Sequence, residues 1–322
     1  MVEHETETAN VAILILLCYR QPFPQMKERL EYAPVWLIAK TLGVLPRPIA
    51  RAIGIGIGRL VYLLHGRLRR VGMQNLGMAF PEKSESERRR ILRGVFTSLG
   101  RLLAEFCLLP RYTRENLEQA AFYEGWENYE AARQRGKGVF FLTAHVGGWE
   151  VGSFSNSLLG YPMHVVVREL DNPYLNRMVQ RYRTLHGNTT FDKQEFARGL
   201  LAAMKAGETV GVLMDTNMTP PQGVFVPFFG VQACTASGIA RVALRTDAAV
   251  VPVFMIWKGG RCCVHMEPAM KLIRTGDNEA DIVANTAAFT AKIEEFVRRY
   301  PDQWLWVHRR WKTRPPGEPP LY

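Results

Sequence analysis

The sequence predicts an α/β protein with a mixed, largely parallel central sheet flanked by helices, preceded by an N-terminal helical, membrane-associated region. Two observations lead to this prediction. Short β-rich runs alternate with helical patterns after about residue 125, and an apolar, helix-patterned stretch interrupted by basic residues comes before it. We therefore divide the chain into a tail, 1–29, a helical membrane-associated region, 30–125, and an α/β domain, 126–322.

The composition indicates a folded and strongly basic protein. Of its 322 residues 47% are hydrophobic, which is too apolar for a disordered chain, and the formal net charge is +11. Such a charge favours an acidic partner: nucleic acid, an anionic membrane surface or an acidic carrier protein. The five cysteines show no CxxC or Cys/His spacing. We therefore expect neither a disulfide framework nor a metal site, and a reducing compartment.

Apolar segments near the N-terminus predict contact with a membrane. Val11–Cys18 is too short to cross a bilayer, which takes roughly 20 apolar residues, and its acidic start is unlike a signal peptide. The longer segments Ala33–Leu45 and Ile49–Leu64 are interrupted by charged residues. We therefore expect a helix or hairpin on the membrane surface rather than a clean transmembrane span, with a buried soluble helix as the alternative.

Helical patterns continue to about residue 125. Apolar residues recur at three-to-four spacing through the stretches 60–64, 91–96 and 102–109. Ser84 and Glu87 form a capping box, which is typical of a helix start. Gly54 and Gly58 lack the spacing of a dinucleotide-binding fingerprint and instead favour close helix packing. The many arginines between residues 67 and 101 fit either a solvated helix face or a face for lipid headgroups.

The second half of the chain has the pattern of an α/β domain. Strands are expected at 138–144, 163–167, 209–214, 249–257 and 262–266, the last of them antiparallel. Helices are expected at 173–185, 196–206, 236–245 and 281–300. Near the C-terminus, Trp304, Trp306 and Trp311 lie in an apolar alternation. This alternation favours a packed strand over a platform for stacked bases, so nucleic acid is not expected as a partner.

The most informative segment follows the first buried strand, where His145-Val-Gly-Gly-Trp-Glu150 leads into a helix. In an open α/β sheet, ligands gather at the carboxyl ends of strands, which is where His145 is placed. Within a regular helix His145 and Glu150 would point about 140° apart, so their contact requires the turn that Gly147 and Gly148 permit. Glu150 could then hold one ring nitrogen of His145 and leave the other to take a hydroxyl proton. A capping or core histidine beside a surface glutamate is the alternative.

This segment resembles the H-x4-E motif of the late bacterial lipid A biosynthesis acyltransferases, which belong to the wider glycerolipid acyltransferase fold. Further blocks follow in the order expected for that family, at 166–173, 181–183, 213–215, 223–230, 250–254 and 304–315. The resemblance covers roughly residues 30 to 322, so the α/β domain would be the acyltransferase domain. Gly148 departs from the pattern, since many relatives carry asparagine there, but neither His145 nor Glu150 changes.

The resemblance implies a role for each matching residue. His145 would be the general base on the acceptor hydroxyl and Glu150 would orient it, while Arg168, Arg183 and Asp215 would bind the glycolipid head or the donor. Judged from the residues alone, Arg183 is more readily a surface helix charge and Asp215 a turn residue. The family further implies that a fatty acyl group passes from an acyl carrier protein or coenzyme A thioester to a lipid A precursor, with no metal or other cofactor.

The resemblance also implies a place in the cell and leaves two alternatives open. The protein would act at the cytoplasmic face of the bacterial inner membrane, either peripherally or anchored by a single helix. The same motifs serve acyltransferases for other glycolipids such as phosphatidylinositol mannosides. A non-catalytic peripheral protein that binds anionic lipid is the alternative from another class. The sequence contains no G-x-S-x-G elbow, Walker loop or H-E-x-x-H motif that would favour other chemistry.

Overall fold

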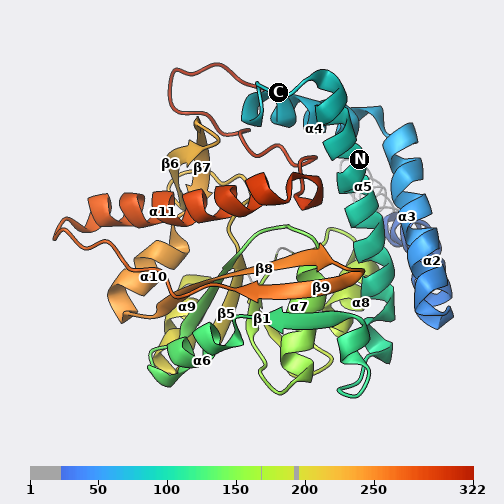
Figure 1. Cartoon of the computed structure of the whole chain (residues 1–322), viewed down its shortest axis with the longest axis horizontal. Coiled ribbons are helices and arrows are strands. Elements are labelled where there is room, and N and C mark those ends of the chain that lie inside the picture. Colours follow the sequence, from blue (N-terminus) through green and yellow to red (C-terminus); the bar gives the residue numbers. More distant parts are fainter. Residues whose placement is uncertain (1–22, 168, 192–195) are drawn as a thin grey trace, which may run out of the picture.

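The structure is a computed structural model that describes residues 23–167, 169–191 and 196–322 (Figure 1). The apolar run at Val11–Cys18 and the predicted site residue Arg168 lie outside the described residues. The N-terminal part consists of α2 (Phe23–Val44), α3 (Arg47–Leu64), α4 (Gly66–Ala79) and α5 (Glu85–Leu108). Because α2 begins at Phe23, the expected boundary after residue 29 falls inside a helix.

Seven strands form the central sheet, in the order β1-β9-β8-β2-β5-β3-β4. Their bounds are β1 (Ala121–Glu124), β2 (Val139–Thr143), β3 (His164–Val166), β4 (Thr189–Phe191), β5 (Thr209–Leu213), β8 (Ala249–Lys258) and β9 (Arg261–Met266). Every neighbouring pair is parallel except β8 and β9, which confirms the largely parallel sheet and the antiparallel last strand. Since β1 already pairs with β9, the sheet begins before the boundary expected at residue 126.

Helices cover both faces of this sheet. They are α6 (Trp126–Gln134), α7 (Trp149–Leu158), α8 (Pro173–Arg183), α9 (Phe196–Lys205), α10 (Gly238–Thr246) and α11 (Asn278–Arg299). Phe140 of β2 packs in one apolar cluster with residues of α9, α10 and α11, while Phe141 packs in the other with residues of α6 and α7. The adjacent Cys262 and Cys263 divide between the two clusters in the same way, as strand alternation requires.

One expected helix is confirmed but starts two residues late, and the strand expected around the C-terminal tryptophans is wrong. Ala236 is the last residue of β7 (Val231–Ala236), which pairs with β6 (Gly223–Phe228) in a separate hairpin, so the expected helix begins only at Gly238. The hairpin turn is Phe229-Gly230, with φ of 52° and 75°. The sequence did not predict this hairpin, because phenylalanine stands where such turns usually have asparagine or aspartate before the glycine. The C-terminal tryptophans are buried as expected, but they lie in turns, with one isolated bridge between Val146 and Trp304.

Glycines allow α3 to lie directly against α5, as the sequence predicts. A Cβ atom at Gly54 would collide with the carbonyl oxygen of Gly100, and one at Gly58 would collide with the carbonyl oxygen of Phe96. Gly100 is equally close to the backbone of Gly54. Figure 1 shows α2, α3 and α5 side by side along one end of the molecule. The predicted capping box is also present, since the side chains of Ser84 and Glu87 each bond the other residue's amide.

The outer surface of α2 and α3 is strongly apolar. Most of the exposed large hydrophobic side chains of the described residues lie there: Met26, Leu30, Val35, Trp36, Leu37, Ile38, Val44, Ile49, Ile53, Leu60, Val61, Leu63 and Leu64. We call this set the apolar face. No single helix in the described ranges has the length and hydropathy of a membrane span, whereas α3 and α4 together do, with a bend of 87° between them. The structure therefore does not show the expected membrane association.

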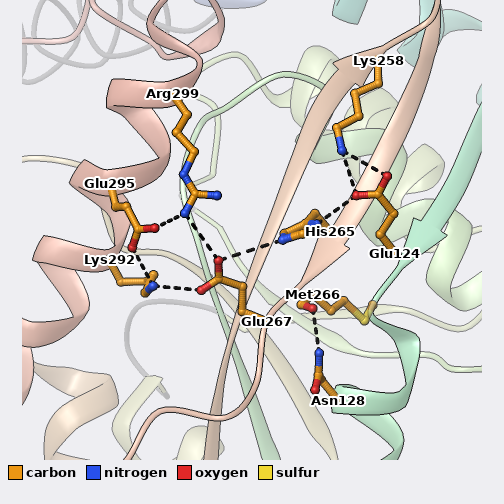
Figure 2. Close-up of polar contacts among 9 residues, drawn as sticks. All are labelled: Glu124, Asn128, Lys258, His265, Met266, Glu267, Lys292, Glu295 and Arg299. Carbon is orange, nitrogen blue, oxygen red and sulfur yellow. Dashed lines mark hydrogen bonds and ion pairs between the residues drawn. The ribbon is translucent and has the colours of Figure 1, made fainter.

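A charged network connects α11 to the edge of the sheet formed by β1, β9 and β8 (Figure 2). His265 of β9 contacts Glu124 of β1 at 3.0 Å through Nδ1, and Lys258 of β8 approaches the same carboxylate at 2.8 Å. On the other side, Lys292 of α11 lies 2.9 Å from Glu267. Hydrogen bonds from Lys258 and then His265 lower the pKa of Glu124 to about 2. Because most of these side chains are partly exposed, each pair adds little to stability.

A fully buried glutamate connects the N-terminal helices to the sheet. Glu105 of α5 is 0% exposed, and its carboxylate lies 2.7 Å from Arg47 Nη2 and 3.5 Å from Arg51 Nε, both on α3. Tyr112 donates its hydroxyl to the same carboxylate at 2.5 Å. Both arginines also donate to the carbonyl oxygen of Gly260, in the turn between β8 and β9. Glu105 therefore holds α3 and α5 against this edge of the sheet.

Replacing Glu105 by glutamine should lower the free energy of unfolding by about 3 kcal/mol, because Arg47 and Arg51 would keep their charges without the opposing buried carboxylate. Urea unfolding followed by circular dichroism measures this loss. Glu85→Gln is the matched control, since Glu85 pairs with Arg89 on the exposed face of the same helix and such a pair contributes about 0.3–0.5 kcal/mol. Equal losses in the two variants would contradict the role given to Glu105.

Candidate active site

The register of two central strands brings His145 and Asp215 together. Strands β2 and β5 run parallel, and Thr143 lies opposite Leu213 at their carboxyl ends. The pairing continues one step further, where the amide of Met214 donates to the carbonyl oxygen of Thr143 at 3.0 Å. His145 and Asp215 each come two residues after these paired ends, so they meet at the carboxyl edge of the sheet. This is the edge at which open α/β sheets bind ligands.

Asp215 is buried and fixed by three hydrogen bonds. Its Oδ1 lies 2.8 Å from His145 Nδ1, and its Oδ2 accepts the backbone amide of His145 at 2.9 Å. Trp304 donates its indole N–H to Oδ2 at 2.7 Å. The side chain of Asp215 is only 2% exposed, whereas that of His145 is 20% exposed. A carboxylate therefore holds His145 from the inside of the protein while the ring remains accessible from the outside.

The charges of the pair stabilise each other. Burial opposes ionisation of Asp215, but the charge and hydrogen bonds of His145, with the bond from Trp304, outweigh it and lower the pKa of Asp215 to about 2. Burial alone would also lower the pKa of His145, yet the adjacent Asp215 carboxylate outweighs it and raises that pKa above its ordinary value. Asp215 is thus an anion that strengthens His145 as a base.

Glu150 does not contact His145 as the sequence predicts. Arg183 of α8 holds its carboxylate with two hydrogen bonds, one from Nε at 3.0 Å to Oε2 and one from Nη2 to Oε1. Among the described residues, the hydrogen-bond partner of the His145 ring is Asp215. The expected orienting contact from Glu150 is therefore wrong, because α7 carries Glu150 toward α8 rather than back over the histidine. The catalytic requirement for Glu150 remains a prediction.

The turn between β2 and α7 requires glycine, as expected, and its amides bond to backbone carbonyl oxygens. Gly147 has a φ of 57°, and a Cβ atom there would collide with the carbonyl oxygen of Met255. The amides of Gly147 and Gly148 donate to the carbonyl oxygens of Gln303 and Met255, so they are not free to bind an oxyanion. By contrast, the first-turn amides of α7 at residues 149–151 have no acceptor within the described structure.

An apolar cavity lies beside this pair, between α7 and the sheet. About 560 Å³ of space between atoms lies in this region when the open solvent at its mouth is included, so the enclosed part is much smaller. Alternate residues of the strands form one wall: Phe141, Thr143, Val165, Val167, Gly211, Leu213, Val253, Met255 and Val264. The other wall is one stripe of α7, with Trp149, Gly152, Ser153 and Asn156. The ring of Trp149 lies 5.2 Å from that of His145, so His145 is next to the cavity.

The structure brings four of the five predicted site residues into one region. His145 and Asp215 are in direct contact, while Glu150 and Arg183 form a second pair that lines the cavity. Arg183 is therefore not a free surface charge, and Asp215 is not a simple turn residue. The fifth residue, Arg168, lies outside the described residues.

Sequence reasoning missed Trp304 as a partner of the site. Trp304 is 1% exposed and donates to Asp215, and the next residue, Leu305, donates its amide to the carbonyl oxygen of His145 at 3.2 Å. The C-terminal segment thus closes over the back of the pair. The tryptophan cluster was visible in the sequence, but its alternation indicated a strand rather than a contact to a carboxylate.

Comparisons with known proteins agree with this site. The family model described as "Bacterial lipid A biosynthesis acyltransferase" matches residues 22–313. The lipid A biosynthesis palmitoleoyltransferase of Escherichia coli (strain K12) is 30% identical over 312 residues, covering 93% of this chain and 99% of the relative. The lauroyltransferase of the same organism is 30% identical over 315 residues, covering 93% and 99%. Its myristoyltransferase is 26% identical over 305 residues, covering 93% of each. The chain belongs to the bacterial lipid A biosynthesis acyltransferase family.

Proposed function

We propose that the protein transfers a fatty acyl group from an acyl carrier protein or coenzyme A thioester to a hydroxyl of a lipid A precursor. Membership of the family makes it an acyltransferase, while the donor, the base and membrane attachment are the parts proposed. The observation that supports this most is a histidine–carboxylate pair beside an apolar cavity. The relatives named for lipid A favour this acceptor over a phosphatidylinositol mannoside.

His145 acts as the general base in this proposal. Its Nδ1 faces Asp215, so Nε2 takes the proton of the acceptor hydroxyl. The hydroxyl oxygen attacks the thioester carbonyl carbon, the carbon–sulfur bond breaks, and the departing thiolate receives the proton from His145. The open amides in the first turn of α7 stabilise the oxyanion, since a helix N-terminus favours negative charge. No metal or further cofactor enters this reaction.

Glu150 and Arg183 complete the rim of the cavity. Two of the guanidinium nitrogens of Arg183 bond Glu150, while Nη1 has no partner within the described structure. We assign this nitrogen to a phosphate of the acceptor or of the donor, because guanidinium groups suit phosphate oxygens. Asp215 was expected to bind substrate, but in this proposal it orients the base. Arg168 keeps its proposed substrate-binding role.

The apolar cavity takes the acyl chain in this proposal. Its walls come mainly from hydrophobic side chains, and its charged residues Glu150 and Arg183 come from the start of α7 and the end of α8. The reactive carbonyl would lie near His145 while the hydrocarbon chain enters the space between α7 and the sheet. Burial of each methylene stabilises the bound chain by about 0.8 kcal/mol.

The apolar face of α2 and α3 supports attachment to a membrane surface. Thirteen exposed large hydrophobic side chains on two neighbouring helices are unusual for a soluble monomer, and the net charge of +11 favours anionic lipid. The same end of the molecule contacts α8, which carries Arg183, so a membrane-bound acceptor would approach the site from there. Peripheral attachment at the cytoplasmic face of the bacterial inner membrane follows from this proposal.

Asp215→Asn should lower kcat and move the acid limb of the pH–rate profile to lower pH. His145 must be neutral to accept a proton, and loss of the carboxylate removes the main cause of its raised pKa. Initial rates with an acyl carrier protein donor and purified lipid A precursor, followed by mass spectrometry, measure both effects. His145→Ala in the same assay should lose at least about 100-fold in kcat.

Glu150→Gln is the matched control for this shift, because it removes a carboxylate from the same site without touching Nδ1 of His145. Its kcat should also fall, since Arg183 loses its charged partner, but its acid limb should move less than that of Asp215→Asn. A larger shift in the Glu150 variant would assign the orienting role to Glu150 instead. Full activity of His145→Ala would overturn the proposed base.

Membrane attachment is tested by placing a charge on the apolar face. Leu37→Glu combined with Ile53→Glu should reduce co-sedimentation with vesicles of phosphatidylglycerol and phosphatidylethanolamine at least tenfold, because a charged residue does not enter the acyl layer. Leu185→Glu is the control, since Leu185 lies beyond the end of α8 and is exposed to nearly the same degree as Ile53. Unchanged sedimentation of the double variant would exclude this face as the membrane contact.

A further inference from the structure

The inner end of the cavity contains a polar side chain with unused hydrogen-bonding capacity. Asn156 of α7 lines the cavity and is 1% exposed. Its Oδ1 is buried and has no hydrogen-bond partner within the described structure. Buried amide oxygens without partners are rare in proteins, and each calls for an explanation. The same cavity is otherwise walled mainly by hydrophobic side chains.

The position of Asn156 is at the far end from His145. It comes six residues after Glu150, which corresponds to about 9 Å along the helix at 1.5 Å per residue. The backbone carbonyl oxygen of Asn156 accepts the amide of Tyr161, in the loop that leads to Met163 and the start of β3. Asn156 is therefore near the amino end of β3. His145 lies at the carboxyl edge of the sheet, which is the opposite end of the cavity.

The orientation of the amide is fixed by its surroundings. Nδ2 of Asn156 donates to the carbonyl oxygen of Tyr161 at 2.9 Å, and a flipped amide would place two oxygens against each other there. Oδ1 is therefore the free end. The nearby buried Asn188 differs, because its oxygen accepts Met163 N and its nitrogen donates to Ser153 O. Asn156 alone of these two has an acceptor left for a ligand.

We propose that Asn156 is a specificity-determining residue that receives a hydrogen-bond donor at the end of the acyl chain. This inference rests on the proposed function, since it assumes that the cavity takes the chain. A chain whose terminal carbon reaches Asn156 and carries a hydroxyl satisfies Oδ1. A methyl-terminated chain of that length displaces water and leaves Oδ1 without a partner, which is costly in a buried site. The cavity thus favours either shorter alkyl chains or chains with a hydroxyl at the far end.

The test uses the wild-type protein and a series of acyl carrier protein thioesters from decanoyl to palmitoyl. Each length is prepared with a terminal methyl and with a hydroxyl on the terminal carbon, and kcat/KM is measured with lipid A precursor. At the length that reaches Asn156, the hydroxyl-bearing chain should equal or exceed the methyl chain. If the inner end were apolar, kcat/KM for the hydroxyl-bearing chain would instead be about 5- to 150-fold lower than for the methyl chain at every length that reaches it.

Asn156→Leu converts the amide into an alkyl side chain of similar branching. In this variant the hydroxyl-to-methyl ratio of kcat/KM should fall by about 5- to 150-fold at that length. Ser153→Ala is the matched control in the same stripe of α7, because the Ser153 hydroxyl already has a partner in the carbonyl oxygen of Glu150. Its ratio should stay as in the wild type. Thermal unfolding of each variant checks that the fold is kept.

The outcomes separate this inference from the proposed function. If the wild type transfers methyl-terminated chains but rejects the terminal hydroxyl throughout the series, the cavity takes the chain and Asn156 does not receive a donor. If the wild type transfers no chain from either series, the proposed function itself fails. An equal fall of the ratio in Ser153→Ala and Asn156→Leu would also overturn the assignment, because it would show a general effect of wall polarity.

Discussion

The parallel pairing of β2 with β5 is the constraint on which the site depends. Asp215 is almost completely buried, and an isolated carboxylate in such a place would be strongly destabilising. It is tolerated because His145 provides two hydrogen bonds and Trp304 a third. These bonds need the two strands to end at the same level, which the register from Val139 to Thr143 ensures. The same interactions that stabilise the buried anion therefore also fix the position of His145, the proposed base.

The cavity combines a polar outer end with an apolar interior, and this division follows from the elements that form it. The start of α7 and the end of α8 supply Glu150 and Arg183, whereas the sheet supplies hydrophobic side chains at alternate positions. A bidentate ion pair at the rim leaves Nη1 of Arg183 without a partner within the described structure, and we propose that this nitrogen binds an anionic substrate group. Asn156 then makes the inner end polar again, and we propose that this lets the cavity distinguish chain ends as well as chain lengths.

The N-terminal helices are held to the catalytic part by contacts of a different kind. Gly54 and Gly58 let α3 approach α5 at backbone distance, so the inward side of α3 has no room for larger residues. Arg47 and Arg51 then meet Glu105 and the carbonyl oxygen of Gly260 at the edge of the sheet. With these glycines and arginines used inward, α3 presents much of its hydrophobic surface outward. The part of the apolar face that α3 contributes is thus a consequence of how this helix packs.

The sequence by itself determined the features that depend on neighbouring residues. Helix caps such as Ser84 act over two or three positions, strand alternation acts over two, and the turn at Gly147 needs a conformation that glycine adopts most readily. These placed His145 at the end of a strand and identified most of the elements. The family resemblance then added Arg183 and Asp215 to the site.

Only the tertiary structure decided which carboxylate meets His145. Glu150 is five positions away but faces α8, whereas Asp215 is 70 residues away and meets the ring directly. Strand order and register determine that contact, and neither can be predicted from a local sequence pattern. The same reason explains Trp304, whose partner is a distant carboxylate, and Asn156, whose unused oxygen is recognisable only once its surroundings are known. Local spacing therefore predicted most of the helices and strands, whereas long-range packing decided which of their side chains meet.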